Sequence, residues 1–230
     1  MLKIPRGCTA YTRKCMFFDW NLGESTQENR LKAMPPCCTK HLREILWYLS
    51  DLFEEQGIFY WLDFGTLLGA VRGGRSIPHD TDGDMCLFMK DKEKVLALAP
   101  RIWRDGFTLN FIKPAHDEML LKVTRSKKNF MMVDLFFWEH DYFSGIYWGT
   151  GLNVPKRFPD WWLQKRDKIL MFDKEMWSPR EPEKFLRMRF GKDWRIPQDK
   201  KVHHYDAELA HKFGFEYAAA NGWKKANKIW

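Results

Sequence analysis

The sequence predicts an α/β domain in which helices pack on a central sheet, and three observations carry this prediction. Residues 58–89 read in order as a β-prone run, a glycine turn, a short helix, an acidic cluster and a second β-prone run. Before them, residues 39–56 repeat apolar side chains at helical spacing. After them, residues 107–138 contain three short β-prone runs, and the turn sequence between the last two predicts a hairpin.

The length of the chain limits the number of domains, and its net charge indicates the kinds of partner that it can bind. A chain of 230 residues can bury a full core, and it fits one domain or one domain with a small appendage. The net charge of +8 favours anionic partners in general: nucleotide diphosphates, phosphorylated glycans, nucleic acid or a membrane surface. We find no apolar stretch of membrane-spanning length and no apolar signal core at the start, so we expect a soluble chain.

The first long helix is expected over residues 39–56. Thr39 can cap its start and Gly57 can end it. Residues 1–36 have few periodic apolar positions and are expected to form an irregular arm. The apolar stripe of the helix should cover the central sheet, and it consists of Leu42, Ile45, Leu46, Leu49, Leu52 and Phe53.

The central stretch contains a candidate catalytic site. Gly65 and Thr66 can expose backbone N–H groups at the start of a short helix, where the helix dipole favours phosphate. Asp80, Asp82 and Asp84 then alternate into an apolar run, and the two-residue period of a strand points the last two carboxylates to one face. Crowded carboxylates repel each other unless a cation lies between them, and oxygen ligands suit Mg²⁺ or Mn²⁺. The alternative is a polar loop that caps a strand.

The stretch LDFGTLLGAVRGGRSIPHDTDGDM, residues 62–85, resembles the family of bacterial LicD phosphocholine transferases and the eukaryotic fukutin and fukutin-related proteins. Residues 179–197, PREPEKFLRMRFGKDWRIP, resemble the C-terminal pattern of that family. The resemblance implies a nucleotidyltransferase-like mixed sheet flanked by helices, in a catalytic domain over residues 39–230.

The activity that the resemblance implies is the transfer of a phosphorylated alcohol from a CDP-activated donor to a glycan hydroxyl, with release of CMP. The cysteine pattern described below resembles that of fukutin-related proteins. This resemblance favours ribitol phosphate as the transferred group, with phosphocholine as the second candidate. No nucleic-acid partner is expected. The compartment would be cytoplasmic for the chain as given, or the Golgi lumen if an N-terminal anchor has been removed.

A third carboxylate is expected from a later strand. Asp134 lies alone between Val133 and Leu135, where a charge is costly unless something binds it. The resemblance implies that such an Asp joins the paired aspartates, so that Asp80, Asp82, Asp84 and Asp134 hold the catalytic ion. The alternative is a partly exposed Asp on an edge strand.

Three basic residues are candidates for binding the donor phosphates. Arg72 follows the short helix and is the expected cationic partner. Lys122 and Arg125 lie on opposite faces of a regular strand, so at most one of them should face the site. Either can also be a solvated surface charge.

Four of the five cysteines lie in the first 38 residues: Cys8, Cys15, Cys37 and Cys38. They can form a tetrahedral Zn²⁺ site, disulfides or free thiols. Fukutin-related proteins have a zinc-binding loop with two cysteines seven positions apart and an adjacent pair about twenty residues later, and this chain resembles that pattern. The resemblance therefore implies a zinc-binding arm over residues 1–38. Cys86 is expected to be a core residue.

The aromatic-rich residues 141–167 are expected to form a loop, either packed or available for stacking on a base or a sugar. A short helix is expected at residues 181–190, and a last helix from His203. Two other functions remain open. One is an NTP-dependent nucleotidyltransferase that acts on nucleic acid or a small molecule, and the other is a non-catalytic nucleotide- or glycan-binding module.

Overall fold

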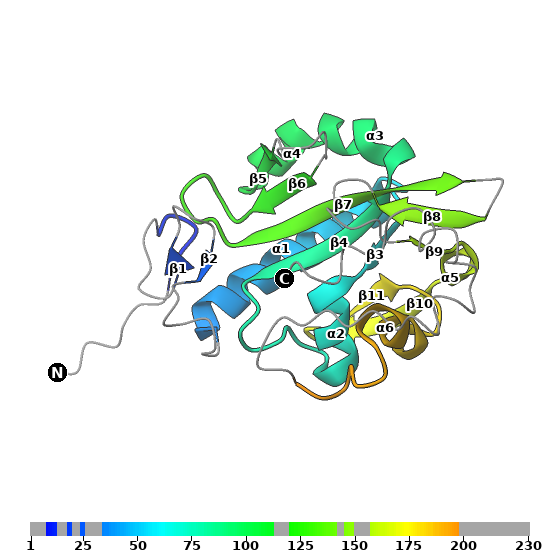
Figure 1. Cartoon of the computed structure of the whole chain (residues 1–230). Coiled ribbons are helices and arrows are strands. Elements are labelled where there is room, and N and C mark those ends of the chain that lie inside the picture. The colour runs from blue at the N-terminus through cyan, green and yellow to red at the C-terminus, as the bar shows by residue number, and fades with distance from the viewer. Residues whose placement is uncertain are drawn as a thin grey trace.

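The computed structural model describes residues 8–12, 18–19, 24–25, 34–112, 120–141, 145–149 and 157–197. In this part of the chain, five strands form a mixed sheet in the order β3-β4-β7-β6-β5, and two short strands extend it beyond β7 (Figure 1). The strands are β3 (Tyr60–Leu62), β4 (Asp82–Phe88), β5 (Thr108–Ile112), β6 (Leu120–Thr124), β7 (Met132–Asp141), β8 (Ile146–Gly149) and β9 (Arg157–Pro159).

The sheet is mixed because β4 and β7 run parallel, whereas β3 with β4, β7 with β6 and β6 with β5 pair antiparallel. The predicted hairpin between the last two β-prone runs is confirmed as β6 and β7. Parallel neighbours need a long crossover connection. Here that connection contains the helices and the two strands between β4 and β7, so β4 and β7 meet although they are far apart in sequence.

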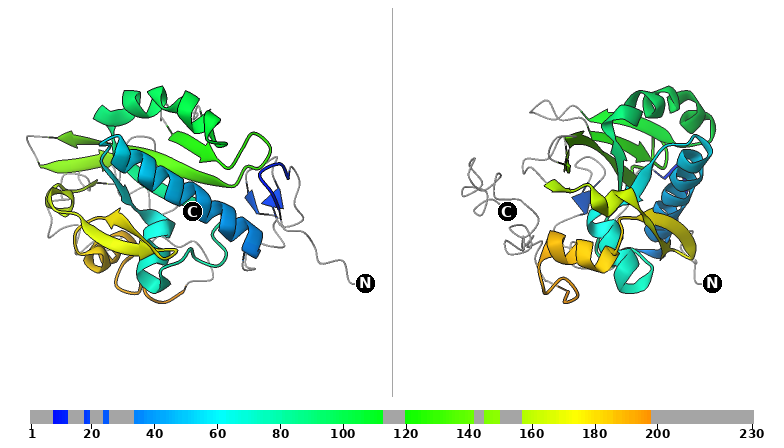
Figure 2. Two further views of the ribbon diagram at one scale, coloured as in Figure 1. Left: turned by 180° about the vertical axis from the view of Figure 1, so that it is seen from behind. Right: turned by 90° about the vertical axis from the view of Figure 1, so that its right-hand side faces the viewer.

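Helix α1 (Pro36–Glu55) covers one face of the sheet, as the left view of Figure 2 shows. It begins three residues earlier than predicted, because Pro36 is suited to the first helical position. Thr39 therefore lies inside the helix and does not cap it. The predicted apolar stripe is confirmed, since all six of its side chains are buried.

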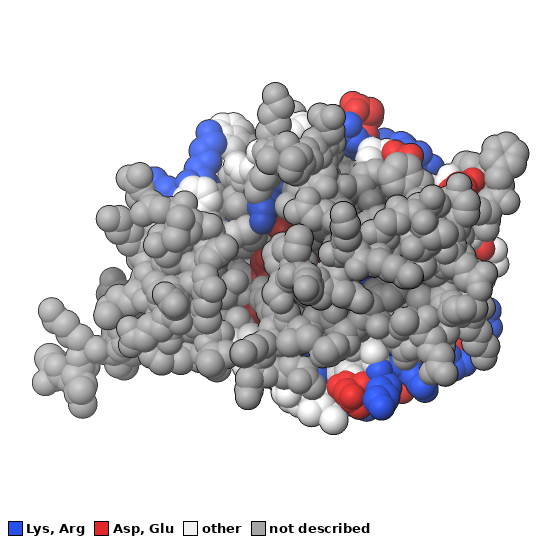
Figure 3. Space-filling view, in the orientation of Figure 1, with Lys and Arg blue, Asp and Glu red and all other residues white. Residues whose placement is uncertain are grey.

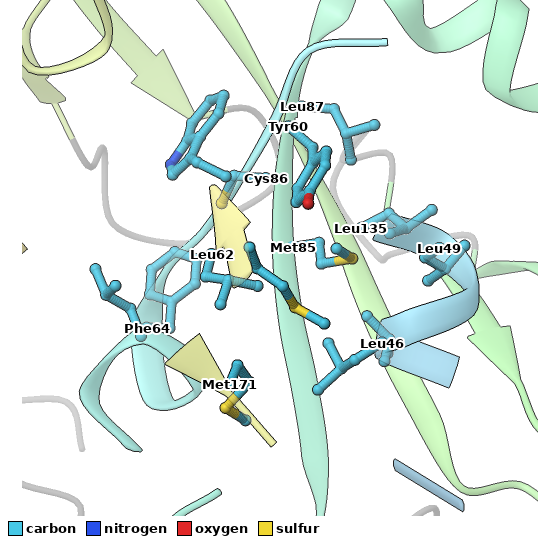
Figure 4. Packing of buried hydrophobic residues seen from close by; sticks show 14 of the residues in the cluster. Leu46, Leu49, Tyr60, Leu62, Phe64, Met85, Cys86, Leu87, Leu135 and Met171 are labelled. Atoms are coloured by element: carbon cyan, nitrogen blue, oxygen red, sulfur yellow. The ribbon is translucent and has the colours of Figure 1, made fainter. Parts of the chain in front are cut away.

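The core lies between α1 and the sheet. Leu46 and Leu49 of α1 lie beside Met85 and Leu135 of the two parallel strands (Figure 4). A Cβ added at Gly83 would lie only 3.0 Å from Leu42 Cδ1, so glycine allows the helix to approach β4 closely. Alternation along β4 then turns the neighbouring residues, including the acidic ones, to the face opposite α1.

Helix α2 and the C-terminal elements pack together at one end of the sheet (Figure 1). Phe172 N donates to Gly74 O at 2.7 Å and joins the end of α2 to the hairpin of β10 and β11. The expected short helix is confirmed, with Pro182 in its first turn and Gly191 after its end. These elements are α2 (Phe64–Gly73), β10 (Asp167–Met171), β11 (Lys174–Ser178) and α6 (Pro182–Phe190).

A 3-10 turn, η2 (Met89–Asp91), leads into α3 (Lys92–Ala97) and α4 (Ala99–Arg104). The sequence from Asp91 to Gly106 predicts one helix, with Asp91 as its cap and Pro100 kinking or shortening it, and the structure contains two. Proline clashes with the preceding turn, so the new helix starts with Pro100 in its first turn. Asp91 stands before α3 as expected, but its carboxylate pairs with Lys94 instead of capping the helix.

The prediction of a loop over residues 141–167 is wrong, because β8, β9 and α5 (Trp161–Gln164) lie there. Phe158 and Trp162 are buried, and the Phe158 ring lies 4.8 Å from Trp138 and 5.2 Å from Phe185. These rings pack the core and are not exposed for stacking. Buried rings that alternate with turn residues are typical of short strands as well as of loops.

Two short strands of the N-terminal arm, β1 (Phe18–Asp19) and β2 (Glu24–Ser25), pair with each other, so that part of the arm is regular. The helix expected from His203 lies outside the described residues. In the part of the chain that the structure describes, none of the helices combines the length and the apolar character that a membrane span requires.

Candidate active site

Three charged side chains stand in line across the sheet. Asp84 of β4 is in register with Asp134 of β7, and Asp134 is in register with Lys122 of β6. Side chains in register on neighbouring strands point to the same face. Lys122 Nζ lies 2.9 Å from Asp134 Oδ1 and 3.0 Å from Oδ2. The structure thus brings together three residues that the sequence places between 12 and 50 positions apart.

The turn at the start of α2 lies against this row. A Cβ added at Gly65 would lie 2.2 Å from Asp80 Oδ2 and 3.6 Å from Asp84 Oδ2, so only glycine leaves room for these carboxylates. Thr66 N donates to Asp84 Oδ2 at 3.3 Å, and Asp84 N donates to Thr66 Oγ1 at 2.7 Å. Because α2 begins at Phe64, Gly65 and Thr66 belong to its first turn, where N–H groups lack helical partners.

Negative charge is concentrated on this face. Asp84 is 9% exposed and Asp134 is 6% exposed. Burial raises the pKa of Asp84 well above its usual value, and the charges of Asp82, Asp80 and Asp134 raise it further. Burial also raises the pKa of Asp134 to about 7, although Lys122 opposes the shift. Acidic side chains are visible near the centre of Figure 3, with a basic side chain close to them.

The chemistry of the four carboxylates fits a hard divalent cation, but their present orientations do not. Asp84 faces Thr66, and Asp134 faces Lys122. Within the described ranges, no three or more His, Cys, Asp or Glu side chains are arranged to hold a metal ion. Asp84 and Asp134 each accept from a hydrogen-bond donor of their own, Thr66 N and Lys122 Nζ.

Of the three predicted phosphate-binding cations, Lys122 alone lies in the row. Arg72 Nη2 donates to the carbonyl of Trp194 and, at 3.2 Å, to that of Ile196. Arg125 Nε donates to Glu44 Oε2 at 2.9 Å, and its Nη1 donates to the carbonyl of Gly106 at 3.1 Å. Arg72 and Arg125 therefore join chain segments in this structure.

The sequence analysis missed a buried ion pair beside the site. Asp63 is 0% exposed and Arg189 is 6% exposed. Arg189 Nε donates to Asp63 Oδ1 at 3.1 Å, and Nη2 donates to Oδ2 at 2.6 Å. Asp63 also caps α2, since its Oδ1 accepts from Phe64 N at 2.7 Å. An Asp just before a Gly-Thr turn is a helix-cap signal that the sequence does carry.

Three of the four N-terminal cysteines lie together. The Cys37 thiol is hydrogen-bonded with Cys8 and Cys38. Burial raises the pKa of Cys37, but these hydrogen bonds outweigh it and leave the pKa below its usual value. Cys15 lies outside the described residues, so the predicted set of four is only partly visible. Cys86 is fully buried, which confirms that it is a core residue.

The comparison with known proteins agrees with the resemblance seen in the sequence. The family model described as LicD/FKTN/FKRP, nucleotidyltransferase domain, matches residues 57–181. The human protein named ribitol 5-phosphate transferase FKRP is 28% identical over 195 residues, which cover 80% of this chain and 38% of that protein. The Macaca fascicularis protein named ribitol-5-phosphate transferase FKTN is 27% identical over 175 residues, which cover 74% of this chain and 36% of that protein.

This chain therefore spans less than two fifths of the length of these relatives. Among solved structures, ANT(2")-Ia in complex with adenylyl-2"-tobramycin aligns over 79% of this chain and 92% of that one, with 10% identity and a TM-score of 0.42. A structural similarity of that size adds nothing to the assignment, which rests on the family model. Because that model matches more than half of the sequence, the chain belongs to the LicD/FKTN/FKRP family.

Proposed function

We propose that this chain is a transferase that moves a phosphorylated alcohol from a CDP-activated donor to a glycan hydroxyl and releases CMP. The observation that carries the proposal is the meeting of Asp84 and Asp134 with the first turn of α2 at Gly65 and Thr66. The names of the relatives favour ribitol phosphate as the group transferred. Phosphocholine, which the resemblance to LicD proteins implies, is the second candidate.

Asp80, Asp82, Asp84 and Asp134 are the residues that would hold a divalent ion, Mg²⁺ or Mn²⁺. Such an ion supplies positive charge to the donor diphosphate and to the leaving CMP. The concentration of negative charge supports this assignment, since a bound cation would relieve the repulsion that raises the pKa of Asp84. Gly65 and Thr66 in the first turn of α2 would bind phosphate oxygens beside the carboxylates.

The transfer step is an in-line displacement at phosphorus. The acceptor hydroxyl oxygen forms a bond to the phosphorus of the alcohol phosphate, while the bond from that phosphorus to the CMP oxygen breaks. An Asp of the cluster, with Asp134 as our choice, accepts the hydroxyl proton as general base. Lys122 forms an ion pair with Asp134 and would neutralise charge on the donor phosphate.

The test is incubation with CDP-ribitol, CDP-choline and CDP-glycerol in turn, with Mg²⁺, while CMP release is measured. We expect release with CDP-ribitol, and none from the Asp82→Ala, Asp84→Ala double variant. Full turnover by that variant would exclude the proposed site.

Titration calorimetry with CDP, CMP and ATP separates the competing functions. Magnesium-dependent preference for cytidine nucleotides supports the proposal. Preference for ATP, with pyrophosphate as product, indicates nucleotidyl transfer, which the net charge of +8 would suit. Nucleotide binding without metal dependence indicates a non-catalytic module.

We also propose that Cys8, Cys15, Cys37 and Cys38 hold a structural zinc ion. The hydrogen bonds that join the thiols of Cys8, Cys37 and Cys38 support this, as does the short distance of 3.0 Å between His41 Nε2 and the Cys8 carbonyl, which ties the arm to α1. Elemental analysis should find one zinc per chain in wild type and in Cys86→Ala, and none in Cys37→Ser, Cys38→Ser. Equal zinc in all three proteins would exclude the site.

A further inference from the structure

The pair formed by Asp63 and Arg189 lies where α2 begins, although its members come from segments 126 positions apart. Both oxygens of Asp63 accept from the guanidinium. Trp61 Nε1 also donates a hydrogen bond to Asp63 Oδ2 at 3.4 Å. Arg189 belongs to α6, which packs on α2 (Figure 1). A residue of α6, distant in sequence, thereby contacts the residue that caps α2.

The residue between this pair and the proposed phosphate-binding turn has an unusual backbone. Phe64 has φ +47°, in the left-handed region that residues with a Cβ rarely adopt. Such a conformation persists only where the surroundings hold it, and it clusters at functional sites. Here Asp63 Oδ1 accepts from Phe64 N, and the Arg189 guanidinium lies 4.9 Å from the centre of the Phe64 ring. Arg189 thus contacts Phe64 at the bend and Asp63 immediately before it.

The bend determines where the next two residues lie. Gly65 is in contact distance of the Asp80 and Asp84 carboxylates, and Thr66 exchanges hydrogen bonds with Asp84. A shift of the bend would move the N–H groups of this turn away from the carboxylates. A misplacement of about 1 Å can lower the rate of an enzyme on the order of a hundredfold.

We infer that Arg189 is a positioning residue: through Asp63 and Phe64 it holds the first turn of α2 at the distance from Asp84 that donor binding requires. The inference deepens the proposed function and rests on it for its binding readout. The alternative is that the pair only stabilises the fold. The two roles predict different results for a variant that folds but lacks the two hydrogen bonds between the guanidinium and the carboxylate. A positioning residue would then change the first turn of α2 and CDP binding, whereas a purely stabilising pair would change neither.

Two variants separate these roles. Asp63→Asn, Arg189→Met removes both charges, so that no unpaired charge stays buried and the fold is expected to survive. Arg189→Lys keeps the charge but loses the planar fork that binds both carboxylate oxygens.

The matched control is Arg166→Met. Arg166 is also stacked on aromatic rings, at 3.6 Å from Phe59 and 4.2 Å from Trp177, but its Nη1 donates to the carbonyl of Tyr60. It shares the packing of Arg189 without touching the start of α2. The control is expected to lose thermal stability and to keep the turn unchanged.

Two measurements are made on each folded protein: hydrogen exchange of the amides of residues 64–66, and calorimetric titration with CDP in Mg²⁺. We expect the double variant to exchange these amides about tenfold faster and to bind CDP on the order of tenfold more weakly, with Arg189→Lys between it and wild type. Arg166→Met should match wild type in both measurements.

Wild-type exchange and wild-type CDP affinity in the folded double variant would overturn the inference. If the double variant does not fold, Arg189→Lys decides by the same two readouts. If wild type itself does not bind CDP, the proposed function fails, and the exchange rates still show whether Arg189 positions the turn.

Discussion

Two buried groups of charged side chains lie on either side of the first turn of α2, and they differ in how their charges are balanced. At Asp63 one carboxylate meets one guanidinium, and both oxygens accept from it. In the row across the sheet, Asp84 and Asp134 stand with Asp80 and Asp82 nearby, and Lys122 is the cation on Asp134. Uncompensated buried charge destabilises a fold, so its presence indicates binding or catalysis. A balanced pair such as Asp63 and Arg189 indicates a structural role, in which the pair holds neighbouring backbone in place.

The largest effect expected from this difference is on activity. The Asp82→Ala, Asp84→Ala variant should lower CMP release from CDP-ribitol by at least about a thousandfold, because the charge that binds the divalent ion is lost. Its midpoint of urea unfolding should equal or exceed that of wild type, since two repelling carboxylates are removed. Asp91→Asn is the control, because Asp91 is buried and paired with Lys94 away from the row. If the double variant lost activity only to the extent that it lost stability, the proposed difference between the two groups of charges would be contradicted.

The second effect is on stability. Arg189→Met alone should lower the free energy of unfolding by about 3–5 kcal/mol, because it leaves the Asp63 carboxylate buried without its partner. The double variant Asp63→Asn, Arg189→Met should lose much less. Urea unfolding measures both, and equal losses in the two variants would show that the charge balance of the pair is unimportant.

A third effect tests the contact between the turn and the row. Gly65→Ala should weaken CDP binding in Mg²⁺ on the order of tenfold, because the added Cβ would displace the Asp80 carboxylate that lies 2.2 Å from it. Gly73→Ala is the matched control in the same helix, since a Cβ there meets nothing within 4 Å. The control should keep its affinity and gain about 0.5–1 kcal/mol of stability. Equal affinity in both variants would argue against the turn as part of the site.

The smallest effect is the dependence of stability on pH in the metal-free protein. The folded-state pKa of Asp134 is raised to about 7, above its unfolded value, so the folded protein holds a proton that the unfolded chain releases. Stability in EDTA should therefore fall as pH rises from about 4 to about 7. Asp134→Asn should flatten this slope, and so should added Mg²⁺. Thermal unfolding across this range measures it, and an identical slope in Asp134→Asn would assign the effect to other groups.

Much of the fold follows from local patterns. The apolar stripe of α1, the hairpin of β6 and β7 and the Pro and Gly limits of α6 were all predicted, because the backbone geometry of one element sets each pattern. The start of α1 was predicted too late, since a proline in the first helical turn outweighed a threonine cap. The strands in residues 141–167 were missed because short strands interrupted by turn residues resemble a loop.

The candidate site also contains residues that the sequence predicted and contacts that it did not predict. The pairing of Asp82 with Asp84 and the Gly-Thr turn were readable in 20 contiguous residues. The contacts of Arg72 with the chain near Ile196, and of Arg125 with Glu44, were not readable, because a sequence pattern does not show which distant partner a cation meets. Arg189 was missed for the same reason.

By itself, the sequence determined which side chains carry charge, which alternate onto one face of a strand, and which glycine stands at the start of a helix. These properties depend only on chain geometry within one element. Only the tertiary structure decided that β7 lies parallel to β4, so that Asp134 stands beside Asp84, and that α6 brings Arg189 to Asp63. Such meetings depend on how whole faces of helices and strands are buried together, and that is a property of the complete fold.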